Sequence, residues 1–346
     1  QKTAYEISLG LVGSEMCIRD RRDLHRHPET AFQERRTADL VADRLASFGY
    51  SVQRGIAETG VVGLLEGDIA GGPTVMIRAD IDALPIQEVD GRAYSSLIPC
   101  AMHACGHDGH ISILLETARI IESLKDTFKG EVILCFQPAE EIVQGAMAMI
   151  NDGLFDDYKP ERVIGLHIWN QLESGFIGVN DTVVFASADA FSLEVRGRGG
   201  HGALPHLNVD PIVAASQIIT NAQTVISREV SPQDPGVLTF GKIESGTASN
   251  IIPDTVSIQG TIRAYSPKVR EQIFSSLKRI SSLSAEAMRT KAVTEIMFGT
   301  PPVINESEVA QWVRDQSGKV IDLSLIHISE PTRPRLISYA VVCLKK

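Results

Sequence analysis

The sequence of 346 residues has no excess of positive charge, no regular set of cysteines and no long apolar run. With 33 Lys and Arg against 43 Asp and Glu, its net charge is −10, so we expect no nucleic-acid partner. No apolar run approaches the roughly 20 residues that span a bilayer, so we expect no membrane partner. The 5 irregularly spaced cysteines argue against a disulfide framework and favour a reducing, cytoplasmic setting.

Two segments near the ends of the chain are predicted to be foreign to the natural protein. Residues 15–20 and 323–329 can be encoded by one DNA sequence and its reverse complement, as in the ends inserted by transposon-based sequencing libraries. A chance match and, at the start of the chain, a short signal peptide are the alternatives. We therefore set aside residues 1–20 and 323–346 and expect the natural C-terminus to be missing.

The remaining residues predict an α/β protein of two domains with a largely parallel sheet flanked by helices. Short apolar strands alternate with amphipathic helices up to about residue 183, and the pattern then changes to strand, helix, two strands and helix. We expect the first part of a catalytic domain at 21–183, an inserted α+β domain at 184–294 and a return segment at 295–322.

Ionisable side chains follow three of the predicted strands. Asp80 and Asp82 follow the first strand, Glu140 and Glu141 follow the second, and His167 ends the third. In open α/β sheets, ligands bind beyond the carboxyl ends of the strands. One shared site at this edge of the sheet is therefore expected.

The segment "AMHACGHDGH" adds Cys105 and His107, which lie two positions apart and so share one side of an extended backbone. Thiolate, imidazole and carboxylate together suit a borderline ion such as Zn²⁺ or Mn²⁺. Glu140 and Glu141 are adjacent, which favours one of them as a ligand and the other as a free base. A metal-dependent hydrolase is the interpretation that uses all of these groups.

A thiol hydrolase is the rival interpretation, with Cys105 as nucleophile and His107 or His103 as its base. This alternative leaves Asp82 and the two adjacent glutamates without a function.

In the predicted inserted domain, three residues are candidates for substrate binding. His201 lies in the glycine-rich segment 197–206, whose backbone can approach a ligand closely. Asn250 and Arg263 follow, and an arginine suits bidentate binding of a substrate carboxylate. An exposed histidine in a tight turn and a solvated strand arginine are the alternatives for His201 and Arg263.

Seven segments occur in the order known from one family of hydrolases: "RRDLHRHPE", "RADIDALPI", "MHACGHDGH", "QPAEE", "GLHIWN", "GGHGALPH" and "SNIIPD". With them, residues 21–322 resemble the metallopeptidase family of aminoacylases and carboxypeptidases. The resemblance is greatest to the branch of hippurate hydrolases, N-acyl-amino-acid amidohydrolases and auxin-conjugate hydrolases. It implies a two-metal enzyme that cleaves the amide bond of N-acyl or N-aroyl amino acids.

The resemblance also implies a metal-binding role for four residues. Cys105 would bridge the two ions, His107 and His167 would hold one of them, and Glu141 would hold the other. Zn²⁺ and Mn²⁺ are the expected ions, although this ligand set also accepts Co²⁺ or Ni²⁺.

By the same resemblance, Glu140 would be the general base that activates water, and Asp82 would orient a ligand. The inserted domain would be a lid that also forms a homodimer. His201, Asn250 and Arg263 would contact substrate there, with His201 reaching the partner subunit's site to stabilise an oxyanion.

The sequence departs from the family's pattern at its end. Members of the family continue with an acidic segment and a last metal-binding histidine, whereas this chain passes into residues 323–346. His327 lies inside the repeated segment, so we do not assign it as that ligand. The alternative function is therefore a catalytically incompetent fragment that binds at most one metal ion.

Overall fold

The computed structural model describes residues 4–89, 91–170, 172, 176–320 and 339–344. The chain divides into two compact units, one of Gln1–Thr182 with Asn305–Lys346 and one of Val183–Ile304. The boundary predicted at residue 294 falls inside strand β13 (Lys291–Thr300), which belongs entirely to the second unit. Within the described residues, no helix is both long enough and apolar enough to cross a bilayer.

The first unit contains a seven-stranded sheet in the order β1-β2-β4-β3-β5-β15-β6. Its strands are β1 (Ser51–Ile56), β2 (Gly60–Glu66), β3 (Ile69–Asp80), β4 (Lys129–Gln137), β5 (Arg162–Ile168), β6 (Ile177–Val179) and β15 (Tyr339–Leu344). The central strands β4, β3 and β5 are parallel, whereas β1–β2, β2–β4 and β5–β15 pair antiparallel. The predicted α/β fold with a parallel central sheet is confirmed.

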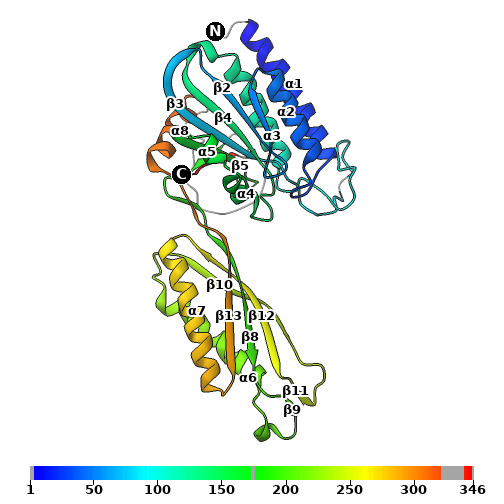
Figure 1. Ribbon diagram of the computed structural model, residues 1–346, viewed down its shortest axis with the longest axis vertical. Helices are drawn as coiled ribbons and strands as arrows, with labels where there is room; N and C mark the ends of the chain where they lie inside the picture. Colours follow the sequence, from blue (N-terminus) through cyan, green and yellow to red (C-terminus); the bar gives the residue numbers. More distant parts are fainter. Residues whose placement is uncertain (1–3, 90, 171, 173–175, 321–338, 345–346) are drawn as a thin grey trace. The chain divides into compact units, whose positions relative to one another are not determined.

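Both faces of this sheet are buried, as the apolar strands predict. In β4, Leu134 and Phe136 pack in the core with helices α1 (Ala4–Arg26), α2 (Arg35–Ser47) and α3 (His107–Glu122). The alternate residues Ile133 and Cys135 pack on the other face with α4 (Gly145–Asn151) and α5 (Leu154–Asp157). Figure 1 shows α1, α2 and α3 together beside the sheet. Because successive side chains of a strand point to opposite faces of the sheet, β4 contributes side chains to both cores.

The two ends that the sequence analysis set aside both contribute secondary structure. Helix α1 begins at Ala4, and Asp20 near its end is buried and pairs with Arg44 of α2 at 2.8 Å. Strand β15 lies between β5 and β6. His327 lies outside the described residues. Helix α8 (Ser307–Val320) also belongs to this unit, where Val309 and Val313 pack with Val179.

The second unit has a four-stranded antiparallel sheet in the order β10-β12-β8-β13. Besides β13, the sheet contains β8 (Ala188–Arg196), β10 (Gly236–Ser245) and β12 (Thr255–Ala264). This unit also contains β7 (Val183–Phe185), β9 (Gly200–His201), α6 (Pro211–Thr224), β11 (Ile251–Ile252), α7 (Pro267–Ala287) and β14 (Val303–Ile304). The Asp210 side chain accepts hydrogen bonds from the backbone N–H groups of Ile212 and Val213, so α6 begins with the N-cap that the sequence predicts. Helices α6 and α7 pack with the sheet around one apolar core.

Candidate metal centre

The carboxyl ends of three adjacent strands carry the candidate site. Strand β3 ends at Asp80, β4 ends before the loop that carries Glu140 and Glu141, and β5 carries His167. Helix α3 begins at His107, so its first turn lies at the same edge. The parallel register of β4, β3 and β5 is what brings these groups together, as the sequence analysis expected.

His107 lies at the centre of the site and is fully buried. Its Nδ1 atom lies 2.8 Å from the carbonyl oxygen of Asp82. Its Nε2 atom lies 3.6 Å from Asp80 Oδ1, 3.8 Å from Glu141 Oε1 and 3.9 Å from Glu140 Oε2. With Nδ1 donating to the backbone, Nε2 faces three carboxylates.

Several polar atoms of the site are buried without a hydrogen-bond partner among the described residues. They include Nε2 of His107, Oε1 of Glu141 and Oδ1 of Asp82. Leaving such an atom unsatisfied costs about 1–3 kcal/mol, so the imidazole nitrogen and the carboxylate oxygens need partners. Divalent cations bind atoms of both kinds, and the residues present therefore fit a metal site.

Candidate ligand atoms form three overlapping groups, each with its atoms within 4.8 Å of one another. The groups are Cys105 with His107 and His167; His107 with Glu140 and Glu141; and Asp80 with His107 and His110. His107 is common to all three, so the ligand atoms surround it on several sides. The ligand set expected from the sequence is thus brought together in one place.

The thiol of Cys105 lies 3.4 Å from Nε2 of His167. Burial raises the pKa of this thiol, so the protein alone does not favour the thiolate that a nucleophile requires. His103, the other base considered for a thiol hydrolase, is also buried, and burial lowers its pKa to about 4. Both of its ring nitrogens are without a hydrogen-bond partner in the described part of the chain. Geometrically, the Cys105 thiol lies within 4.8 Å of candidate ligand nitrogens of His107 and His167.

Burial and the neighbouring charges shift the pKa values of several groups in the site. Burial and the Asp80 carboxylate raise the pKa of Glu140, and burial also raises the pKa of Glu141. Burial opposes a charge on His107, but the carboxylates of Asp80 and Asp82 outweigh it and raise the pKa of His107 to about 11. Binding a cation at Nε2 therefore displaces a proton.

A buried network behind the site was missed by the sequence analysis. Asp80 Oδ2 accepts a hydrogen bond from Arg78 at 2.7 Å, and Asp80 Oδ1 accepts one from Nδ1 of His110 at 2.5 Å. The backbone N–H of Ile168 donates to Nε2 of His110 at 2.8 Å, so the proton of His110 lies on Nδ1. His110 thereby ties β3 to the strand end that carries His167. The spacing of His107 and His110, three positions apart on one helix face, was the available signal.

The candidates in the second unit are only partly brought together. The backbone N–H of Gly202, next to His201, donates to the carbonyl of Asn250 at 2.8 Å, and both side chains are exposed. Arg263 lies at the far end of β12, where its guanidinium donates to the carbonyl of Asp189 at 3.2 Å. His201 and Asn250 can therefore act together, whereas Arg263 lies apart from them.

Comparison with known proteins identifies relatives of this site and fold. Residues 76–335 match the model of peptidase family M20/M25/M40. The chain is 40% identical to an N-acetyl-L-cysteine deacetylase of Bacillus subtilis over 302 residues, 86% of this chain and 71% of the relative. It is 42% identical to an N-acyl-L-amino acid amidohydrolase of Geobacillus stearothermophilus over 289 residues, 83% of this chain and 77% of the relative.

Among solved structures, the fold is similar to that of a dinuclear metal-binding M20 peptidase from Bacillus subtilis. The TM-score is 0.81 at 28% identity, and the alignment covers 95% of this chain and 88% of the other. The family predicted from the seven segments is therefore confirmed, and the chain belongs to peptidase family M20/M25/M40.

Proposed function

We propose that this chain hydrolyses the amide bond of N-acyl or N-aroyl amino acids, releasing a carboxylic acid and an amino acid. The observation that carries the proposal is the pair of unsatisfied buried atoms, His107 Nε2 and Glu141 Oε1, which face each other at 3.8 Å. Relatives that deacylate N-acetyl-L-cysteine and N-acyl amino acids support this class of substrate.

Four side chains would hold two divalent ions at the strand ends. Cys105 would bridge them, His107 and His167 would hold one, and Glu141 would hold the other. The short distance from Cys105 Sγ to His167 Nε2 and the grouping of Cys105 with both His107 and His167 support a shared ion for these three residues. When bound, such ions lower the pKa of water and polarise an amide carbonyl.

Glu140 would be the general base. Its side chain is 40% exposed, whereas that of Glu141 is 17% exposed, so Glu140 is the glutamate more accessible to substrate and water. Burial and the Asp80 carboxylate raise its pKa, which suits a group that takes a proton from water and returns it to the leaving amine.

Asp82 would hold two ligands in place without contacting substrate. Its Oδ2 atom accepts a hydrogen bond from the backbone N–H of Glu141 at 2.9 Å, and its Oδ1 atom lies 3.3 Å from Nδ1 of His107. Such outer contacts set the orientation and basicity of metal ligands.

We propose Zn²⁺ or Mn²⁺ as the bound ions, with Co²⁺ or Ni²⁺ as substitutes that this mixture of ligands accepts. We also propose a cytoplasmic location. Cys17, Cys100, Cys105 and Cys135 are free thiols, and Cys105 must stay reduced to bind metal.

The second unit would act as a lid and as the surface for a homodimer. His201, Asn250 and Arg263 would contact substrate, with His201 donating to the oxyanion in the partner subunit's site. The exposed, glycine-flanked position of His201 supports a role in contacting a ligand.

The proposal is tested by measuring metal content and the hydrolysis of N-acetyl and N-benzoyl amino acids, before and after treatment with a chelator. We expect two ions per chain and turnover that the chelator removes and added metal restores. One ion per chain without turnover would support the incompetent fragment instead. Turnover that survives complete metal removal would support the thiol hydrolase.

A further inference from the structure

We propose that Glu34, at the start of α2, is a positioning residue that fixes the backbone of the loop carrying Glu140 and Glu141. The inference rests on the function proposed above for those two carboxylates. Glu34 is distant from them in sequence and belongs to a segment to which the sequence analysis assigned no chemistry.

The Glu34 side chain is directed at that loop. Glu34 is fully buried, and its Oε1 atom accepts a hydrogen bond from the backbone N–H of Ala139 at 2.9 Å. Its Oε2 atom accepts one from the hydroxyl of Thr59 at 2.7 Å. Although Glu34 occupies the N-cap position of α2, its side chain makes no capping hydrogen bond. The carboxylate therefore binds the loop that follows β4 and does not cap α2.

The loop needs such a contact because its backbone is strained. Ala139 has a φ of 50° and Val143 a φ of 62°, a left-handed conformation that residues with a Cβ atom avoid. The carbonyl of Ala139 accepts hydrogen bonds from the N–H groups of Gln144 at 3.3 Å and Gly145 at 3.1 Å. Glu34 binds the backbone N–H of the same residue. Losing that bond allows Ala139 to relax, which would turn the adjacent Glu140 and Glu141 away from His107.

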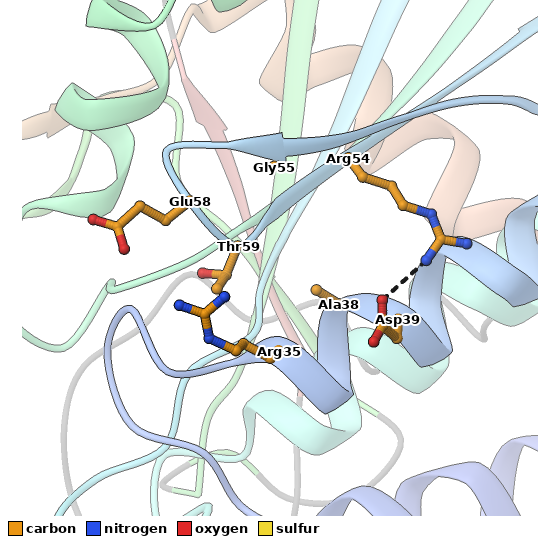
Figure 2. A pocket seen from close by; sticks show the side chains of 7 residues that line it. All are labelled: Arg35, Ala38, Asp39, Arg54, Gly55, Glu58 and Thr59. Carbon is orange, nitrogen blue, oxygen red and sulfur yellow. Dashed lines mark hydrogen bonds and ion pairs between the residues drawn. The ribbon is translucent and has the colours of Figure 1, made fainter.

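Thr59 binds the second oxygen of the Glu34 carboxylate. It is 3% exposed and lines a cavity of about 280 Å³ together with Arg35 and Arg54 (Figure 2). Arg54 is already paired with Asp39 at 3.0 Å, the dashed line in Figure 2. The Thr59 hydroxyl donates its hydrogen bond to Glu34, so removing that hydroxyl is a mild way to disturb the position of the Glu34 carboxylate.

The same segment offers a matched control. Glu29 Oε1 accepts a hydrogen bond from the N–H of Arg36 at 3.0 Å, and its Oε2 atom accepts one from the N–H of Thr37 at 2.8 Å. These contacts cap the first turn of α2 and do not reach the metal site. Glu29 and Glu34 thus differ in what their carboxylates bind, although both residues lie near the start of α2.

The experiment compares Glu34→Leu, Glu34→Gln and Glu29→Leu with the unchanged chain. Each protein is assayed for kcat and KM on an N-acetyl amino acid and for Zn²⁺ affinity by competition with a chromophoric chelator. Glu34→Leu should lower kcat by about 10- to 100-fold, the effect of misplacing a reacting group by about an ångström, and should weaken Zn²⁺ binding. Glu34→Gln should recover most of both losses, because its amide oxygen can accept from Ala139.

Glu29→Leu should lower the unfolding temperature but leave kcat and Zn²⁺ affinity within about twofold of the unchanged chain. Equal losses in Glu29→Leu and Glu34→Leu, or no loss in Glu34→Leu, would overturn the inference. If Glu34→Leu does not fold, Thr59→Val replaces it and should show smaller losses in the same two quantities, and no loss would again overturn it. If the unchanged chain has no hydrolytic activity, the proposed function fails, while the Zn²⁺ affinities still decide the role of Glu34.

Discussion

The two units differ sharply in the ionisable side chains that they bury. In the described part of the first unit these are Asp20, His25, Glu34, Tyr50, Asp80, Asp82, His103, His107, Asp108, His110 and Cys135. In the described part of the second unit the buried ionisable side chain is Asp189. Burying a charge is costly unless it is paired, so the first unit gives up stability that the second retains.

The difference extends to how well the buried groups are satisfied. Asp189 binds Arg270 at 2.5 Å and accepts the N–H of Gly299 at 3.0 Å, so its charge is fully partnered. In the first unit, His107, Asp82 and Glu141 keep buried atoms without partners. The carboxylate buried in the second unit is therefore structural, whereas the unpartnered atoms of His107, Asp82 and Glu141 in the first unit mark the place where a cation fits.

The largest expected effect is on activity, from Glu140→Gln in the first unit. Loss of the general base should lower kcat by about 10²- to 10⁴-fold. Removing a negative charge beside Glu141 and Asp80 should leave the metal-free unit as stable as before or more so. Steady-state kinetics and thermal unfolding of the metal-free protein measure the two effects. Full activity in this variant would remove Glu140 from the mechanism.

The next largest effect is on stability, from Phe191→Ala in the second unit. Phe191 is fully buried in the apolar core with Leu193 and Ile258, so the cavity should cost about 3–5 kcal/mol of unfolding free energy. Hydrogen exchange should show faster opening in β8 and β12, with β3 and β4 unchanged. Equal loss of protection in both units would show that they unfold together.

Metal binding should slow hydrogen exchange in the first unit and leave that of the second unit unchanged. Ions at 100 times their dissociation constant stabilise a folded unit by about 2.7 kcal/mol. Protection from hydrogen exchange should therefore rise in β3, β4 and the start of α3, and not in β8 or β12. Chelator should reverse the rise. A rise confined to the second unit would contradict the site described at the strand ends.

The smallest expected effect is the acid sensitivity of the second unit. Burial of Asp189 favours its neutral form, but the Arg270 guanidinium and the Gly299 N–H outweigh burial and lower the pKa of this carboxyl. Its contribution to stability is therefore complete above the unfolded value of about 3.9 and is lost as pH falls through the lower folded value. The stability advantage over Asp189→Asn, followed by hydrogen exchange in β8, should shrink below about pH 4. An advantage that is constant from pH 6 to pH 2 would be inconsistent with this ion pair.

Much of the fold and of the site could be predicted because the signals are local. Apolar runs that end in acids or histidine placed β3, β4 and β5 and the groups at their ends, and Asp210 with Pro211 marked the start of α6. The parallel sheet then made a common edge for those groups.

The contacts that were missed join segments far apart in the chain. Glu34 reaches Ala139, and His110 reaches Ile168, through hydrogen bonds that leave no periodic pattern in the sequence. The positive φ of Ala139 could not be predicted from the sequence either, because alanine rarely adopts a left-handed conformation. Arg263 was grouped with His201 by function, but the length of β12 separates them.

The most direct test of the metal centre is the X-ray absorption spectrum of the Zn²⁺-loaded protein, compared with that of Cys105→Ser. We predict one sulfur ligand at about 2.3 Å among nitrogen and oxygen ligands in the unchanged chain, and no sulfur ligand in the variant. A sulfur-free spectrum in the unchanged chain, or one that Cys105→Ser leaves the same, would contradict a metal centre built on Cys105 at the strand ends.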